Sequence, residues 1–220
     1  DRWSEICASN GKMECFLRRH AASWGMTCTE CSRTKECACK NPHPGDCPKC
    51  EKGESPWNAD VVKELDLRLK RETELFASRD VVIVQSPHYY VVTDIPSLKL
   101  RTQSGVYRVA GTHELAHIYA ERCEKARRDF CRGFTDEVGG GKPSAVYLPK
   151  RESAAAKIQG RYNSSPRTNL LYGGSDDGKI ADGYCFNGFC NSLQKGGGDD
   201  EGLHHSVRHM IGHLCVSCWT

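Results

Sequence analysis

The apolar pattern begins with a single helical period after the first quarter of the chain. Val62, Leu65, Leu69 and Phe76 recur three, four and seven residues apart, and charged residues fill most of the positions between them. Apolar side chains at this spacing share one face of a helix. The pattern therefore predicts an amphipathic packing helix over residues 57–76.

The pattern then changes to β-branched and aromatic residues. Residues 81–84 read Val-Val-Ile-Val, and residues 88–93 read His-Tyr-Tyr-Val-Val-Thr, with a Ser-Pro turn signal between the two runs. Such runs are typical of strands. Two strands are predicted here, and a structural role is the more frequent one for a single histidine such as His88.

A long helix is predicted over residues 107–130. Apolar positions spaced three and four apart form a core stripe, and His113 and His117 fall at its flank. The same rotation places Glu114 further toward solvent. The core stripe consists of Ala116, Tyr119, Cys123, Ala126 and Phe130.

The remaining pattern predicts a strand at residues 145–149, a helix at 153–162 and a strand around 179–181. A last helix is predicted over residues 201–218, because five apolar residues return on one face. That face consists of Leu203, Val207, Met210, Ile211 and Leu214.

These elements predict an α+β fold, with a small mixed sheet packed with helices over residues 57–220. A loop-rich, cysteine-rich module is predicted over residues 1–56, and the boundary falls at turn residues before the first helix. The module has few large apolar side chains. Cross-links would therefore have to replace a hydrophobic core in it.

Charge and hydropathy narrow the classes of partner. The chain has 31 basic and 28 acidic residues, a net charge of +3, and the two signs are interleaved. A nucleic-acid-binding protein usually shows a basic stripe, so no nucleic-acid partner is expected. No apolar run approaches the roughly 20 residues of a membrane span. The expected partners are proteins or peptides, including other subunits of a complex.

Fourteen cysteines, eight of them in the first fifty residues, indicate cross-linking. Cys28 and Cys31 form one C-x-x-C pair and Cys47 and Cys50 a second, with fifteen residues between the pairs. This spacing is typical of a four-cysteine zinc ribbon, while an even cysteine count fits disulfides outside the cytoplasm equally well. The start at Asp1 without a Met favours an exported, extracytoplasmic protein. The second pair resembles a unit of the zinc module of DnaJ-type chaperones. This resemblance implies that the cysteines bind zinc.

Residues 113–117 read His-Glu-Leu-Ala-His, the H-E-x-x-H pattern of zinc metallopeptidases. Residues four apart on a helix lie one above the other, so His113 and His117 can bind one zinc ion. Glu114 would then activate a zinc-bound water as the general base. The third ligand would come from Asp136, Glu137, His205 or His209.

A second histidine pair, His209 and His213, lies four residues apart in the last predicted helix. The order of elements over residues 80–218 resembles the gluzincin metallopeptidase fold, in which the zinc helix follows most of the sheet. The resemblance implies that His209 and His213 bind zinc. However, Met210 stands where that family has its catalytic Glu, and a thioether cannot accept a proton.

Two functional hypotheses follow. The first is a zinc metallopeptidase that uses Glu114 and a zinc-bound water. The second is a catalytically inactive, zincin-like protein that serves as a cross-linked structural or assembly subunit of a larger complex. The first rests on the intact H-E-x-x-H, and the second rests on Met210 and the dense cysteines.

Overall fold

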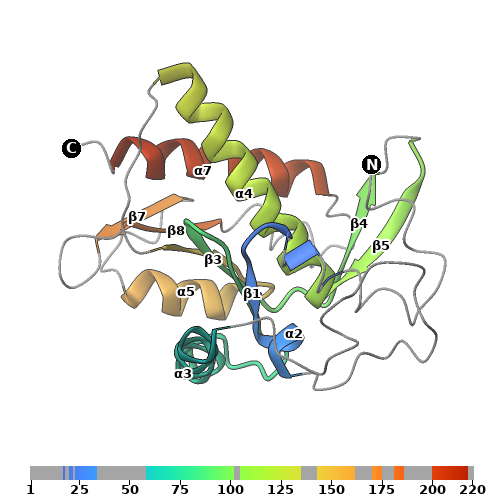
Figure 1. Cartoon of the computed structure of the whole chain (residues 1–220), viewed down its shortest axis with the longest axis vertical. Helices are drawn as coiled ribbons and strands as arrows, with labels where there is room; N and C mark the ends of the chain where they lie inside the picture. The colour runs from blue at the N-terminus through green and yellow to red at the C-terminus, as the bar shows by residue number, and fades with distance from the viewer. Residues whose placement is uncertain are drawn as a thin grey trace.

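The computed structural model describes residues 17, 20–21, 23–33, 58–101, 105–134, 143–161, 170–174, 181–185 and 200–217. These residues form a mixed sheet with helices on both of its faces, together with a separate two-stranded ribbon (Figure 1). The α+β class expected from the sequence is confirmed. The zincin-like likeness and the cysteine-rich module stay predictions.

The six-stranded sheet has the order β1-β2-β3-β6-β8-β7. Neighbours β3 and β6, and β6 and β8, run parallel, and the other neighbouring pairs are antiparallel. Strand β1 has two residues, and Cys28 in it pairs with Val84. The first C-x-x-C pair therefore begins on an edge strand of the main sheet. The strands are β1 (Thr27–Cys28), β2 (Val82–Gln85), β3 (Tyr89–Thr93), β6 (Ser144–Leu148), β7 (Leu170–Gly174) and β8 (Ala181–Cys185).

Helices cover both faces of this sheet. In Figure 1, α3 (Ala59–Phe76) and α5 (Glu152–Arg161) lie on one face, and α4 (Thr112–Phe134) and α7 (Asp200–Ser217) lie on the other. The short helix α2 (Thr29–Arg33) follows β1 directly. Among the described residues, no helix has the length and apolar character needed to cross a membrane.

Side chains of the central strands alternate between two hydrophobic cores. On β3, Val91 faces the core under α4 and α7, while Tyr90 and Val92 face the core under α3 and α5. On β6, Val146 and Tyr147 divide in the same way. A period of two is what a strand buried on both faces requires. The apolar run at residues 81–84 therefore reflects two covered faces.

The described part of the N-terminal region packs into the core under α4 and α7. Leu17, Ala21 and Met26 are almost fully buried there. Trp24 packs against the same core and lies under the cationic groups of Lys125 and Arg128 of α4. The predicted division at residue 56 stays a prediction, because most of residues 1–56 lie outside the described residues.

Most predicted elements lie within a few residues of their observed positions, with one clear correction. The helix expected over residues 107–130 begins only at Thr112, and Tyr107–Gly111 forms strand β5. It pairs antiparallel with β4 (Ser97–Arg101), which the pattern did not predict, and the two make the ribbon. β-Branched and aromatic side chains in β5 favour a strand over an early start of the helix.

Candidate metal centre

Four of the predicted ligands converge on one point: Cys28, Cys31, His113 and His117, here called the metal centre. Their ligand atoms all lie within 4.8 Å of one another. Sγ of Cys28 and Sγ of Cys31 each lie 3.3 Å from Nε2 of His113. Sγ of Cys31 lies 3.5 Å from Nε2 of His117. The arrangement can hold a metal ion.

The local structure explains why these side chains meet. Cys28 ends β1, and Cys31 lies in α2, which turns the second thiol back toward the first. Pairing of β1 with β2 fixes this turn, and Ile83 N donates to Oγ1 of Thr29 at 3.2 Å. On α4, the i and i+4 spacing brings the two imidazoles to the same side.

Distances within the metal centre fit tetrahedral ligation. With Zn–S bonds of about 2.3 Å and Zn–N bonds of about 2.0 Å, tetrahedral angles place sulfur and nitrogen about 3.5 Å apart. The sulfur–nitrogen distances from Cys28 and Cys31 to His113, and from Cys31 to His117, span 3.3 to 3.5 Å. Two thiols and two imidazoles are also a donor set that structural zinc sites use.

The surroundings of Cys28 and His117 favour the protonation states in which these side chains bind metals. Burial alone would raise the pKa of Cys28, but the hydrogen bond with Cys31 and the nearby imidazoles of His117 and His113 hold that pKa well below its usual range. Burial lowers the pKa of His117, which favours the neutral imidazole. Metals bind thiolates and neutral imidazoles, so both shifts favour metal binding.

A second layer of contacts supports the metal centre from the N-terminal side. The imidazole of His20 packs edge-on against that of His117, with ring centroids 5.8 Å apart. Nε2 of His20 lies 2.8 Å from a carboxylate oxygen of Glu121, one turn further along α4. Lys125 forms an ion pair with the same carboxylate. The segment that carries the two cysteines is therefore held against α4 by more than the centre itself.

The environment of Glu114 differs from the expected one. Its carboxylate is only 6% exposed and forms an ion pair with Arg108 of β5, with Nη1 and Oε1 2.6 Å apart. Burial raises the pKa of Glu114, and Arg108 acts in the opposite direction. The placement of Glu114 toward solvent was wrong, because the helical period could not foresee that the ribbon covers it.

The other predicted ligands lie elsewhere. His209 and His205 are exposed on α7, and the described residues contain no second cluster of metal-binding side chains. His213 lies in α7, but its side chain is outside the described part of the chain, as are Cys47 and Cys50 and the candidates Asp136 and Glu137.

Signals for the metal centre were present in the sequence, but as two halves of different sites. By its spacing, the C-x-x-C pair is typical of a zinc ribbon, and the histidine pair is typical of a peptidase. Each half supplies two ligands, and a closed zinc site needs four. The supporting residues His20, Arg108 and Glu121 had no recognisable signal, because they act through contacts distant in sequence.

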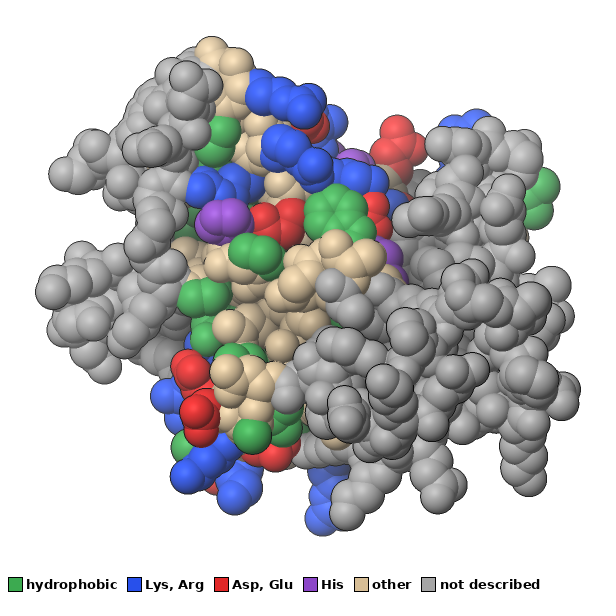
Figure 2. Space-filling model, in the orientation of Figure 1, with side chains coloured by type: hydrophobic (Ala, Val, Ile, Leu, Met, Phe, Trp, Pro, Cys, Tyr) green, Lys and Arg blue, Asp and Glu red, His purple; other side chains and the backbone are tan. Residues whose placement is uncertain are grey.

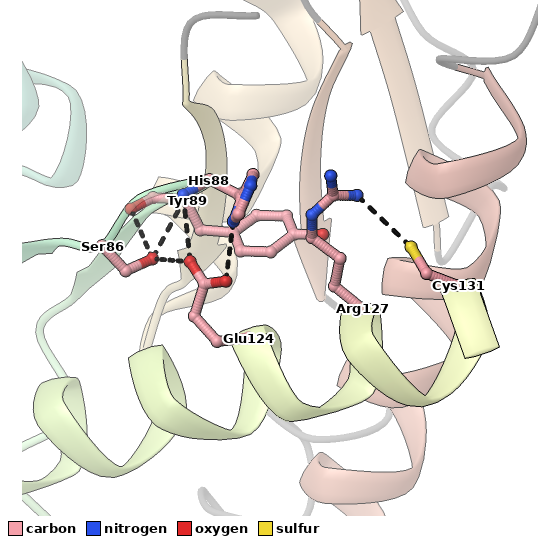
Figure 3. A network of polar contacts seen from close by, with 6 residues as sticks. All are labelled: Ser86, His88, Tyr89, Glu124, Arg127 and Cys131. Atoms are coloured by element: carbon pink, nitrogen blue, oxygen red, sulfur yellow. Dashed lines mark hydrogen bonds and ion pairs between the residues drawn. The ribbon is translucent and has the colours of Figure 1, made fainter. Parts of the chain in front are cut away.

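A separate polar network joins the start of β3 to α4 (Figure 3). The carboxylate of Glu124 accepts from Oγ of Ser86 at 2.6 Å and from the backbone N of His88 at 2.9 Å, and it lies 2.8 Å from Nδ1 of His88. Arg127 donates to Sγ of Cys131 beside it. The contacts of His88 agree with the structural role expected for it.

Basic side chains mark the outer surface of α4. Figure 2 shows Lys and Arg side chains gathered over this helix. Several of them are engaged: Arg122 pairs with Asp200, Lys125 pairs with Glu121, and Arg128 lies over Trp24. Several basic side chains on α4 therefore hold neighbouring elements together and do not simply face solvent.

Comparison of the chain with models of protein families, with curated proteins and with solved structures found no match.

Proposed function

We propose that this chain is a zinc-binding protein whose metal centre is structural. What supports the proposal most is the convergence of four ligand atoms within 4.8 Å of one another. Zinc sites with four protein ligands are closed, and catalytic ones keep a position for water. In this proposal zinc ties the segment around Cys28 and Cys31 to the first turns of α4.

The peptidase hypothesis has weaker support. If all four ligands bind, no position on a tetrahedral ion is left for the attacking water. The carboxylate of Glu114 faces Arg108, and its buried ion pair is a structural role that needs no substrate. We therefore favour the catalytically inactive alternative, with Glu114 as a support for the junction between the ribbon and α4.

The proposal takes only one feature from the resemblance to gluzincins, which is the order of the strands and helices along the chain. Helix α7 follows the strands of the sheet, as the zinc helix of that fold does, and it carries His209. Met210 is fully buried in the core, where it cannot act on a substrate. An extracytoplasmic location and a place in a larger complex stay predictions.

Zinc content measured on purified variants tests this proposal. Cys28→Ser and His117→Gln are expected to lose the bound zinc. Cys131→Ser and His209→Gln, which lie outside the metal centre, should keep it. Glu114→Gln should also keep it. Loss of zinc in His209→Gln would contradict the proposal and support a gluzincin-type site.

A peptidase assay on the same proteins separates the two functions. Wild type and Glu114→Gln are expected to show the same background hydrolysis of an unfolded protein substrate. Zinc-dependent hydrolysis by wild type that Glu114→Gln abolishes would establish the peptidase instead.

A further inference from the structure

Exposed apolar side chains concentrate on the ribbon. Val106 is 63% exposed, Tyr107 56% and Val109 62%. Among the described residues, the remaining large exposed hydrophobic residue is Leu67, on α3. Single exposed apolar residues are ordinary, but a contiguous group indicates a surface that something covers.

The strand register shows which side chains lie beside this group. Lys99 pairs with Val109, and Arg101 pairs with Tyr107. Directly paired residues project from the same side of a sheet. These four residues therefore form one surface, here called the ribbon face, while Leu98, Leu100 and Ala110 are buried on the opposite side.

The composition of the ribbon face is unusual for a solvent-facing surface. An antiparallel pair with one solvated side normally alternates apolar residues inside with polar residues outside. In β4 this holds, because Lys99 and Arg101 face out. In β5 it fails, because Tyr107 and Val109 are exposed. Strand propensity favours Tyr107 and Val109 in β5, but it does not require two large apolar side chains on the side that faces solvent.

We propose that the ribbon face docks an acidic protein segment that carries apolar side chains between its carboxylates. Lys99 and Arg101 would pair with the carboxylates, and Tyr107 and Val109 would bury the apolar side chains. The face has two cations and no acidic residue. The charge of the partner follows from this composition.

Other occupants fit the ribbon face less well. A second copy apposed across a two-fold axis would bring like charges together. A nucleic acid could use the cations and stack on Tyr107, but Val109 has no group that could bind a phosphate or form a hydrogen bond with a base edge. A bilayer would need an apolar tip, and the residues joining the strands read Thr-Gln-Ser-Gly-Val, with Val106 as their one large apolar side chain. An acidic peptide uses every group on the face.

The proposal goes beyond the structural metal centre and does not depend on it. The ribbon face is nevertheless linked to the helix of the metal centre. Arg108 lies in β5 between Tyr107 and Val109 and forms an ion pair with Glu114 of α4. Docking on the ribbon would therefore occur one residue away from the contact that fixes the ribbon to α4.

Fluorescence anisotropy with the 220-residue, zinc-loaded chain tests the proposal. The probe is a pool of short synthetic peptides in which Glu alternates with Val, Leu, Phe or Tyr. One control pool has Lys in place of Glu, and another has Ser in place of the apolar residues. We expect saturable binding of the first pool and binding weaker by about tenfold or more for both controls.

Variants of the ribbon face connect binding to these residues. Tyr107→Thr with Val109→Thr should weaken binding of the Glu pool by about tenfold or more. Lys99→Glu with Arg101→Glu should do the same and reverse the preference toward the Lys pool. Leu67→Ser and Lys70→Glu, at exposed positions of α3, are matched controls and should bind like wild type. Unchanged thermal unfolding of all variants shows that the fold persists.

Several results would overturn the proposal. These are absence of saturable binding to the Glu pool, equal binding of all pools, or binding that the ribbon variants do not change. Tighter binding of a single-stranded oligonucleotide that Tyr107→Thr abolishes would assign the face to nucleic acid instead. Self-association that the Tyr107 and Val109 variants abolish would assign it to a second copy.

Discussion

Sγ of Cys28 lies 3.3 Å from Nε2 of His113, although 85 residues separate the two in the chain. One residue ends a two-residue edge strand, and the other lies in the first turn of α4. A metal ion between them would close a long loop, which is where a cross-link restricts the unfolded chain most. The metal centre is therefore expected to contribute to stability as well as to local geometry.

Removal of the metal should destabilise the whole fold. A ligand present at about 1000 times its dissociation constant adds about 4 kcal/mol to the free energy of unfolding. We expect a chelator to lower the urea midpoint of wild type and of His209→Gln by the same amount, and zinc to restore it. An unchanged midpoint in chelator would show that the metal centre does not stabilise the fold.

Introducing a peptidase motif on α7 should damage the protein rather than activate it. Met210→Glu would create His-Glu-x-x-His at residues 209–213, but Met210 is fully buried in the core. A carboxylate there loses its hydration without a partner, at a cost of several kcal/mol. Met210→Leu, a volume-conserving control, should cost less than about 1.5 kcal/mol. Urea unfolding measures both, and a stable, proteolytically active Met210→Glu would contradict this account.

The start of α7 is expected to depend on Asp200. Arg122 donates to both carboxylate oxygens of Asp200, and the hydroxyl of Tyr119 donates to Oδ1 at 2.7 Å. Asp200→Asn should lower the free energy of unfolding by about 2 kcal/mol, because charge-assisted bonds are lost. Glu201→Gln, at the exposed neighbouring position, should change it by less than about 0.5 kcal/mol. Equal effects of the two substitutions in chemical denaturation would refute this role.

Glu124 should make stability depend on pH in the acid range. Burial alone would raise its pKa, but hydrogen bonds from His88 and Ser86 leave it below the ordinary value of 4.5. The folded protein thus binds fewer protons at this site than the unfolded chain. The contribution is complete above pH 4.5 and is lost as the pH falls through the folded pKa.

Comparison with Glu124→Gln isolates this contribution. The difference in unfolding free energy between wild type and Glu124→Gln should be largest near neutral pH and should shrink below pH 4.5. Asp129→Asn, at an exposed position on the same helix, provides the control and should parallel wild type. A difference that stays constant down to strongly acid pH would contradict the assignment.

The sequence was informative where a local period decides the structure. The apolar face of α7 is buried as expected at Leu203, Val207 and Met210, because a 3.6-residue period is visible without any partner. The predicted start of α4 is too early, because the apolar stripe begins only at Ala116 and residues 107–111 are too few to show a period of their own. Their pairing with residues 97–101 decides in favour of the strand.

The sequence identifies the four ligands of the metal centre, but it does not show that they meet in one site. Cys28, Cys31, His113 and His117 were each singled out, since C-x-x-C and H-x-x-x-H have recognisable spacings. Which half joins which depends on the pairing of β1 with β2, and a strand of two residues has no detectable period. The burial of Glu114 depends in the same way on Arg108, which lies in a strand that the pattern did not reveal.

X-ray absorption at the zinc edge of the purified protein identifies the atoms that bind the metal. The metal centre predicts two sulfur ligands at about 2.3 Å and two imidazole nitrogens at about 2.0 Å. It also predicts that His113→Gln with His117→Gln loses the bound zinc and therefore the absorption signal, while His209→Gln keeps the spectrum of wild type. A shell of four sulfurs would contradict the account, because it would assign zinc to a cysteine ribbon. An oxygen or water ligand beside two imidazoles would contradict it as well, because it would indicate an open, catalytic ion.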